Sequence, residues 1–300
     1  MYLETFSLPI DREEQMIEAR MRENDSGFGY IDNVYPCGIF PPLQLREIGF
    51  SRITVLYGGN GSGKSTLLNL IAAKLGLNRV APFNSGELFE TYAENCRYTT
   101  GTDEEGFPLR IPNGSRIITS DDVFDYMLAV RGNNEEIAET VEQGKAEYAR
   151  IKFGENVVLK GMDDYEALRQ QVQARRKTLS RRMFLRKFAG TEVRLNSNGE
   201  TALQYFEEKL KNDTLYCLDE PENSMSPKTQ LELTRLLEEM ARYCGCQFVI
   251  ATHSPFLFAL SGARIYDLDD APVAIKNWWE LENTRIYYEF FQKHRHLFEE

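Results

Sequence analysis

The stretch "ITVLYGGNGSGKSTLLNLIAAKLG", residues 53–76, decides the fold of this protein. It opens as an apolar run typical of a buried strand and passes into a turn rich in glycine. The predicted helix that follows ends at Gly76 and has its apolar residues at helical spacing, at Leu67, Leu68, Ile71, Ala72 and Leu75. A strand, a glycine-rich turn and a helix in this order predict an α/β fold built around a phosphate-binding loop.

The glycine-rich turn has the residue types that bind a nucleotide's phosphates. It completes the pattern G-x-x-x-x-G-K-[ST], whose backbone N–H groups close around phosphate oxygens at the start of a helix. We expect Lys64 to reach the β- and γ-phosphates and Ser65 to bind Mg²⁺. The sequence therefore predicts binding of ATP or GTP, with contacts from Gly58, Gly59, Asn60, Gly61, Ser62, Gly63, Lys64, Ser65 and Thr66.

A second apolar run, "TLYCLDEPE" at residues 214–222, ends in carboxylates. Asp219 stands where a nucleotide-binding site needs a magnesium ligand at the end of a strand. Glu220 is placed one residue further on, where a carboxylate can polarise a water for attack on the γ-phosphate. We interpret Glu222 as a surface charge.

A third apolar run, "CQFVIATHS" at residues 246–254, predicts the neighbouring strand. His253 follows this strand, where an imidazole could contact the γ-phosphate or the attacking water. The segment 227–245 between the two runs has helical periodicity, so the three pieces form a strand, helix, strand unit. His294 and His296 are interpreted as exposed or packed residues of a final helix.

With these motifs in this order, the chain resembles an ABC-type ATPase, specifically the stand-alone prokaryotic "AAA family" ATPases related to RecF and SMC heads. The resemblance places the signature loop at "NSNGETALQYF", residues 196–206, where Ser197, Gly199 and Glu200 match its pattern best. It also implies that ATP binding drives homodimerisation, with Ser197 and Gly199 of one copy at the nucleotide of the other. Taken alone, these residues favour an ordinary helix N-cap, whereas together with the other motifs they favour the signature loop.

Two further family features have weaker counterparts. The Q-loop residue would be Asp121, in "RIITSDDVFDY" at residues 116–126. The aromatic side chain that stacks on adenine could be Tyr30, Tyr35 or Phe40, although aromatic residues at such positions also serve as core. The sequence does not choose among the three.

These predictions combine into an α/β P-loop fold of ABC-ATPase type, with a mostly parallel core sheet, an N-terminal antiparallel β portion and a helical lobe. We expect residues 1–84 and 200–276 to form the nucleotide-binding core. Residues 85–199 would form the lobe that ends in the signature loop, and 277–300 a C-terminal helix. The lobe would hold an acidic helix at 133–153 and a second helix from Asp163 to about Phe188, which contains the basic run 175–187.

Composition limits the possible partners. A net charge of −11 argues against a surface that coats nucleic acid or acidic membrane as a whole. Five scattered cysteines, interpreted as buried thiols without a metal, and no apolar run long enough for a bilayer indicate a cytoplasmic protein. Two other functions stay open: an ATP-gated scaffold that acts through a partner protein, and a DNA-engaging ATPase of repair or anti-phage defence.

Overall fold

A computed structural model describes residues 1–24, 34–83, 85–154, 164–176, 180, 184–185 and 197–298. The chain divides into two compact units: Met1–Phe124 with Asn198–Glu300, and Asp125–Ser197. The first unit contains both sheets and all the strands among the described residues. Each unit is described by itself below.

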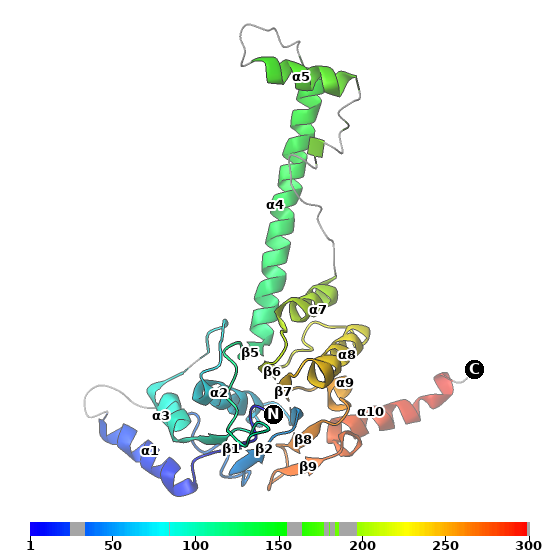
Figure 1. Ribbon diagram of the computed structural model, residues 1–300. Helices are drawn as coiled ribbons and strands as arrows, with labels where there is room; N and C mark the ends of the chain where they lie inside the picture. The colour runs from blue at the N-terminus through cyan, green and yellow to red at the C-terminus, as the bar shows by residue number, and fades with distance from the viewer. Residues whose placement is uncertain are drawn as a thin grey trace. The chain divides into compact units, whose positions relative to one another are not determined.

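The first unit is built on a six-stranded sheet in the order β5-β6-β7-β3-β8-β9 (Figure 1). All neighbouring strands are parallel except β8 and β9, which are antiparallel. The parallel order brings the carboxyl ends of β3, β6 and β7 to one edge of the sheet. The strands are β3 (Ile53–Tyr57), β5 (Arg116–Thr119), β6 (Leu215–Asp219), β7 (Gln247–Ala251), β8 (Arg264–Asp267) and β9 (Ala274–Lys276).

A second, antiparallel sheet has the order β2-β1-β4, with β1 at Thr5–Ser7, β2 at Glu47–Gly49 and β4 at Arg97–Thr99. In its register Phe6 lies opposite both Ile48 and Tyr98. The predicted fold class, a mainly parallel sheet with an N-terminal antiparallel portion, is therefore confirmed.

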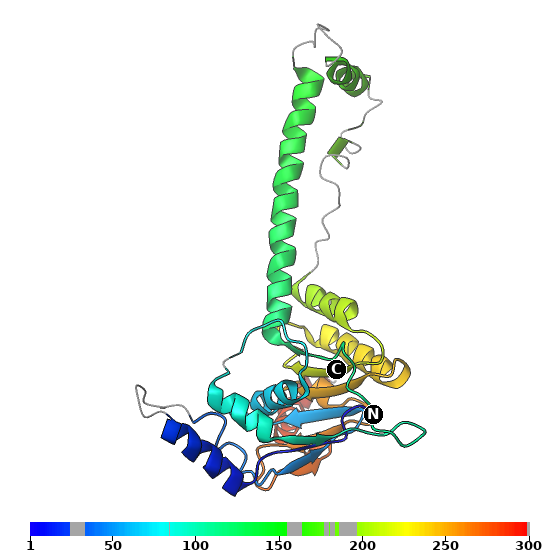
Figure 2. The same ribbon diagram turned by 60° about the vertical axis from the view of Figure 1, so that its left-hand side comes forward.

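The helices of the first unit connect these strands. Helix α2 lies beside the strands of the first unit, and its position can be followed by colour in Figures 1 and 2. Helix α2 ends as predicted, because Gly76 adopts a left-handed conformation with φ 61° and donates its N–H to the carbonyls of the last turn. The helices are α1 (Asp11–Asn24), α2 (Lys64–Leu75), α3 (Glu87–Asn95), α7 (Asn198–Lys209), α8 (Pro227–Tyr243), α9 (Pro255–Phe258), α10 (Glu282–Lys293), and the 3-10 turns η1 (Trp278–Glu280) and η2 (Arg295–Leu297).

The apolar residues of helix α8 do not all lie on its buried side. Leu233 and Leu237 are fully buried, but Leu231 is 43% exposed. The buried ridge is completed by Thr229 and Ala241, which stand four residues before and after these leucines. Small residues at the two ends of this ridge pack against the core, and the large Leu231 faces away from it.

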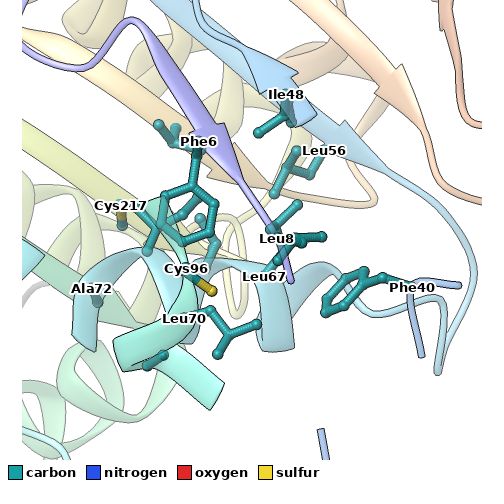
Figure 3. Close-up of a cluster of buried hydrophobic side chains, with 14 of the residues drawn as sticks. Phe6, Leu8, Phe40, Ile48, Leu56, Leu67, Leu70, Ala72, Cys96 and Cys217 are labelled. Carbon is teal, nitrogen blue, oxygen red and sulfur yellow. The ribbon is translucent and has the colours of Figure 1, made fainter. Parts of the chain in front are cut away.

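The core lies where both sheets meet helix α2 (Figure 3). Phe6 and Ile48 of the small sheet pack into the same cluster as Leu67 and Leu70 of α2 and Leu56 of β3. All five of these side chains are at most 1% exposed. The helix that begins at the glycine loop is therefore held by the deepest packing in the first unit, which fixes the position of its N-terminus.

The cysteines are free thiols. Four of them are buried, namely Cys37, Cys96, Cys217 and Cys246, and Cys244 is partly exposed. Burial raises the pKa of the Cys217 thiol to about 12, so it stays protonated at neutral pH. No described helix has the length and apolar character needed to cross a bilayer.

Where the structure describes it, the second unit contains α4 (Ser120–Phe153), whose first five residues belong to the first unit, and α5 (Asp164–Arg175). Helix α4 begins directly after β5, well before the acidic stretch from which a helix was predicted. At the other end of α4, the Arg175 guanidinium donates to the carbonyl oxygens of Lys152, at 3.2 Å, and Gly154, at 2.8 Å. Beyond Arg176, most of the basic run and of the helix that was predicted to extend to Phe188 lies outside the described residues.

Helix α1 contributes a buried carboxylate to the first unit. Glu14 is 5% exposed, and its Oε1 accepts a hydrogen bond from the Gly38 N–H. Its Oε2 has no hydrogen-bond partner among the described residues. Burial, and then the charges of Asp11 and Glu18, raise the pKa of Glu14. The carboxyl of Glu14 therefore binds its proton more tightly in the folded state than in the unfolded chain.

We expect Glu14→Gln to stabilise the protein relative to the wild type increasingly as the pH rises above the ordinary pKa of a glutamate, about 4.3. A folded-state pKa above the unfolded one means that the wild type loses stability when the buried carboxyl ionises, whereas the amide does not ionise. Urea unfolding at several pH values, followed by circular dichroism, measures this difference. The exposed Glu94→Gln is the control, and a pH-independent difference for Glu14→Gln would contradict the expectation.

Candidate functional site

Three loops meet at the edge of the sheet where β3, β6 and β7 end. The glycine loop, Gly58–Gly63, leaves β3 and opens α2. Asp219 ends β6 and Glu220 follows it, and residues 252–254 follow β7. Because β7 lies between β3 and β6, the loop after β7 is next to both of the others.

The glycine loop is wrapped around the Lys64 ammonium. Its Nζ donates to the carbonyl oxygens of Gly58, at 2.7 Å, and Gly59, at 2.8 Å. Burial lowers the pKa of Lys64, and the nearby carboxylates, Glu220 first, oppose this effect. Gly63 has φ 94°, and a Cβ there would lie 2.9 Å from the side chain of Ile39, so only glycine fits this position. The tip of the loop, Asn60 and Gly61, is exposed, and Ser62 is partly buried.

Ser65 and Asp219 lie side by side across the site. The Ser65 hydroxyl donates to Asp219 Oδ1 at 3.0 Å. Burial raises the pKa of Asp219 to about 6, an effect that the Ser65 hydrogen bond opposes and the neighbouring Glu220 increases. Two oxygens at this separation match adjacent ligands of octahedral Mg²⁺, which are roughly 3.0 Å apart when each metal–oxygen bond is about 2.1 Å. The predicted metal residues therefore fit Mg²⁺.

Glu220 and His253 face each other, with the histidine Nε2 3.5 Å from Glu220 Oε1. That separation is long for a hydrogen bond, and His253 Nε2 has no hydrogen-bond partner among the described residues. The other Glu220 oxygen, Oε2, accepts from the Asn223 side-chain amide at 3.0 Å. Glu220 itself has φ 49°, a left-handed conformation that costs a non-glycine residue roughly 1–2 kcal/mol. Its N–H donates to the Ala251 carbonyl of β7 at 2.8 Å, which holds it in place.

The interpretation of Glu222 as a surface charge is wrong. This side chain is only 9% exposed. Its Oε1 accepts three hydrogen bonds, from the Thr252 hydroxyl at 2.6 Å, the His253 N–H at 2.8 Å and the Ser254 N–H at 3.1 Å. Glu222 therefore fixes the backbone that carries His253. The left-handed backbone at Glu220 directs the chain so that Glu222 reaches the residues after β7. No residue pattern in the sequence indicates this turn.

Asp269 is a second residue that sequence reasoning missed. Both of its carboxylate oxygens lie 2.8 Å from the Gly59 nitrogen, which donates to them. The Asp269 N–H donates to Oδ1 of the buried Asp267, at 3.0 Å, and Lys276 Nζ donates to Oδ2 of Asp267 at 2.8 Å. The contacts thus run from β9 through β8 to the first turn of the glycine loop. Only the acidic run that follows the apolar "RIYDL", residues 264–268, could have suggested this arrangement.

Arg79 also influences the site. It lies after α2, where its guanidinium is 4.0 Å from the centre of the Phe83 ring and bonds to the Asn69 side chain. Its positive charge partly offsets the effect of burial on the pKa of Asp219. The sequence contains no motif around Arg79 that marks it.

The proposed signature residues lie at the start of α7. A Cβ on Gly199 would be 3.3 Å from the Thr229 hydroxyl of α8, so this glycine packs closely against that helix. Ser197 precedes α7 and is exposed, as is Glu200 in the first turn. A contact from Ser197 and Gly199 to the nucleotide of a second copy stays a prediction.

The candidates for the Q-loop and the adenine contact have distinct surroundings. Asp121 is exposed in the first turn of α4. Tyr35 donates its hydroxyl to the Thr66 hydroxyl at 3.2 Å and stacks on Phe89. Phe40 is buried beneath Gly63, and Tyr30 lies outside the described residues. The roles of these residues stay predictions.

The two remaining histidines lie away from the three loops. His294 caps the end of α10, with its ring 4.9 Å from that of Phe290. His296 lies in η2 and is exposed.

One family matches part of the chain. Residues 200–259 match the family described as "AAA domain, putative AbiEii toxin, Type IV TA system". The matched segment contains Asp219, Glu220 and His253. The predicted resemblance to an AAA family ATPase is thereby confirmed for this segment. A comparison with curated proteins finds no match.

Several solved structures are similar to the chain at low identity. The SMC head domain from Thermotoga maritima shares 15% identity over 92% of this chain and 99% of that one, with a TM-score of 0.36. The Smc head domain from Pyrococcus furiosus, bound to the C-terminal domain of ScpA, shares 15% identity over 81% and 94%, with a TM-score of 0.41. A dimeric ATP-binding cassette bound to ADP and Pi shares 16% over 74% and 83%, with a TM-score of 0.34. At these scores, the assignment of a P-loop fold depends on this chain's own strand order and glycine loop.

We expect Glu222→Ala to lower the free energy of unfolding by about 2–3 kcal/mol, because three donors lose their acceptor in a buried place. Glu222→Gln keeps the accepting oxygen and should cost less than about 1 kcal/mol. Urea unfolding followed by circular dichroism compares the two variants. If Glu222→Ala changes the free energy of unfolding by less than about 0.5 kcal/mol, as for an ordinary surface residue, the three hydrogen bonds do not stabilise the fold as expected.

Proposed function

We propose that the chain is a magnesium-dependent ATPase whose two copies close around ATP and hydrolyse it. The observation that carries this proposal is the group formed at one sheet edge by Lys64, the Ser65–Asp219 pair, and Glu220 facing His253. Phosphate binding, metal binding and a candidate base thus occur within one site. Nucleotide binding is also what the matched AAA domain family implies.

Binding would begin at the glycine loop. The Lys64 ammonium is held in the loop by two backbone carbonyls, so it needs little rearrangement to meet phosphate oxygens. The start of α2 adds backbone N–H groups and the positive end of a helix dipole. Ser65 and Asp219 would hold Mg²⁺, which supplies positive charge to the phosphates when bound.

Hydrolysis would use Glu220 as the group that directs and deprotonates water. Asn223 holds one oxygen of this carboxylate, and the other faces the imidazole of His253. His253 Nε2 makes no hydrogen bond to the described residues and can donate to or accept from the γ-phosphate or the water. Glu222 positions His253 through the backbone.

The proposed dimer would complete an open site. Ser65, Asn60 and Gly61 are exposed in a single copy, so a nucleotide bound there would remain in contact with water. A second copy would exclude that water, and Ser197 and Gly199 of that copy would add an α7 N-terminus to the γ-phosphate. Water exclusion strengthens every charge interaction in the site.

We expect Lys64→Ala to weaken ATP binding by at least about 100-fold, because it removes the cation from the glycine loop. Isothermal titration calorimetry with Mg-ATP measures the affinity. Lys74→Ala, in the last turn of the same helix, is the matched control and should bind as the wild type does. A folded Lys64→Ala protein with unchanged affinity would refute phosphate binding by this loop.

We expect Glu220→Gln to retain ATP binding but lower phosphate release by roughly 100-fold or more, since the amide cannot take a proton from water. The exposed Glu239→Gln is the control.

The closed state that accumulates can be trapped by a cross-link between two differently tagged copies. One copy carries Ser197→Cys, the other carries Asn60→Cys, and a short bismaleimide joins the two thiols. A cross-link that forms equally with and without ATP argues against closure, and turnover near the wild-type rate argues against Glu220 as the base.

A further inference from the structure

Helix α10 and the turn η2 carry a large apolar surface in contact with solvent. Only Thr284 of α10 is buried. Seven apolar side chains of this segment are between 48% and 69% exposed, and we call them the aromatic face: Ile286, Tyr287, Tyr288, Phe290, Phe291, Leu297 and Phe298. Trp279, just before the helix, is also about half exposed.

The base of α10 is fixed to the first unit. Leu281 is fully buried, and the Asn283 N–H donates to the Tyr57 hydroxyl of β3 at 3.2 Å. A capping box between Asn277 and Glu280 orders the turn before the helix. The aromatic face is therefore displayed by an element with a defined start.

The rings of the aromatic face pack on one another. Phe290 and Phe291 lie 5.6 Å apart between centroids, and Phe291 and Phe298 lie 6.0 Å apart. A shallow hollow of about 290 Å³ is lined by Tyr288, Phe291, Gln292, Arg295 and Phe298. These contacts order the side chains without removing them from water.

The size of this face is that of a protein interface. Aromatic side chains present roughly 150–250 Å² each, so seven apolar side chains of which about half is exposed offer on the order of 800 Å². The largest apolar patch of an ordinary monomer is roughly 300–600 Å². A standard interface buries about 800 Å² per partner, so this segment exposes enough apolar surface for one interface of ordinary size.

The charges beside the face fit a second copy. On α10, Arg285 and Glu289 form a row beside the apolar row of Ile286 and Phe290. Arg285 and Glu289 form no ion pair with described side chains, and the Arg285 guanidinium lies 5.6 Å from the centre of the Tyr288 ring. Consider two α10 helices that pair antiparallel about a two-fold axis located between residues 287 and 288. Each row of side chains then lies against the same row of the second copy, which runs in the opposite direction. Arg285 then lies one residue from the level of Glu289 of the second copy, and Ile286 one residue from the level of Phe290, which is an axial offset of about 1.5 Å.

We propose that the aromatic face of α10 is a homodimer interface that forms without nucleotide. The helix starts with Glu282 and ends with Lys293, so antiparallel pairing also brings opposite charges and opposite dipole ends together. A membrane surface fits less well, because the polar side of α10 carries two glutamates against Arg285 and Lys293 and the whole chain has a net charge of −11. The interface is separate from the nucleotide site and does not depend on hydrolysis.

The test uses the full chain in EDTA without nucleotide, so that closure around ATP makes no contribution. Sedimentation equilibrium between about 1 and about 100 µM should give a dimer with a Kd of a few µM. Ile286→Ser combined with Phe290→Ser should raise this Kd by at least about 100-fold. Tyr243→Ser, which removes an exposed aromatic ring at the end of α8, is the matched control and should leave the Kd unchanged.

Charge reversal tests the antiparallel register. Arg285→Glu alone and Glu289→Arg alone each place like charges together and should raise the Kd roughly 10-fold. A mixture of the two single variants should dimerise as well as the wild type, since every Glu then meets an Arg.

Three results would overturn the proposal. They are a wild-type monomer throughout the concentration range, single charge variants with wild-type Kd, and a mixture that does not recover. A monomer that binds anionic vesicles through Phe290 would indicate a membrane surface instead. Because Lys64→Ala should still dimerise through α10, failure here is distinguishable from failure of the proposed ATPase function.

Discussion

The backbone hydrogen bonds that pair β3 with β7, and β7 with β6, in parallel determine most of this structure. They bring the ends of three strands from distant parts of the chain to one sheet edge. The hydrogen bond from Ser65 to Asp219 then joins the helix after β3 to the end of β6. Packing of Leu67 and Leu70 into the core holds that helix, so the phosphate-binding end of α2 cannot move independently of the carboxylates.

Charge in the site is divided unequally. One buried ammonium, that of Lys64, lies near the carboxylates of Asp219, Glu220 and Asp269. Phosphates alone would bring further negative charge to a region that already has an excess of it. Divalent cation and nucleotide are therefore expected to enter the site together, because the cation offsets the repulsion between phosphate and carboxylate.

The sequence predicts well those residues whose function depends on a local pattern. The glycine loop, Asp219 and His253 each follow an apolar run, so their meeting at one edge follows from parallel pairing. Glu222 and Asp269 could not be found in this way, because their partners lie in other loops and depend on which strands are neighbours. The exposure of Phe290 and Phe291 could not be predicted either, because a helix whose apolar side is buried and one whose apolar side is exposed have the same apolar periodicity.

The position of β3 in the sheet has a consequence for biosynthesis. Ile53 pairs with Phe248 and Tyr57 with Asp267, so the central strand is translated long before either of its neighbours. On the ribosome the apolar segment "ITVLY" has no partner strand until the chain has passed residue 251, and its second neighbour is complete only after residue 267. The nascent protein must keep that segment from pairing with other chains, either through early packing against α2 or through a chaperone. Slow translation through the second unit would lengthen this period, and expression yield should respond to codon choice there more than in the segments before β3.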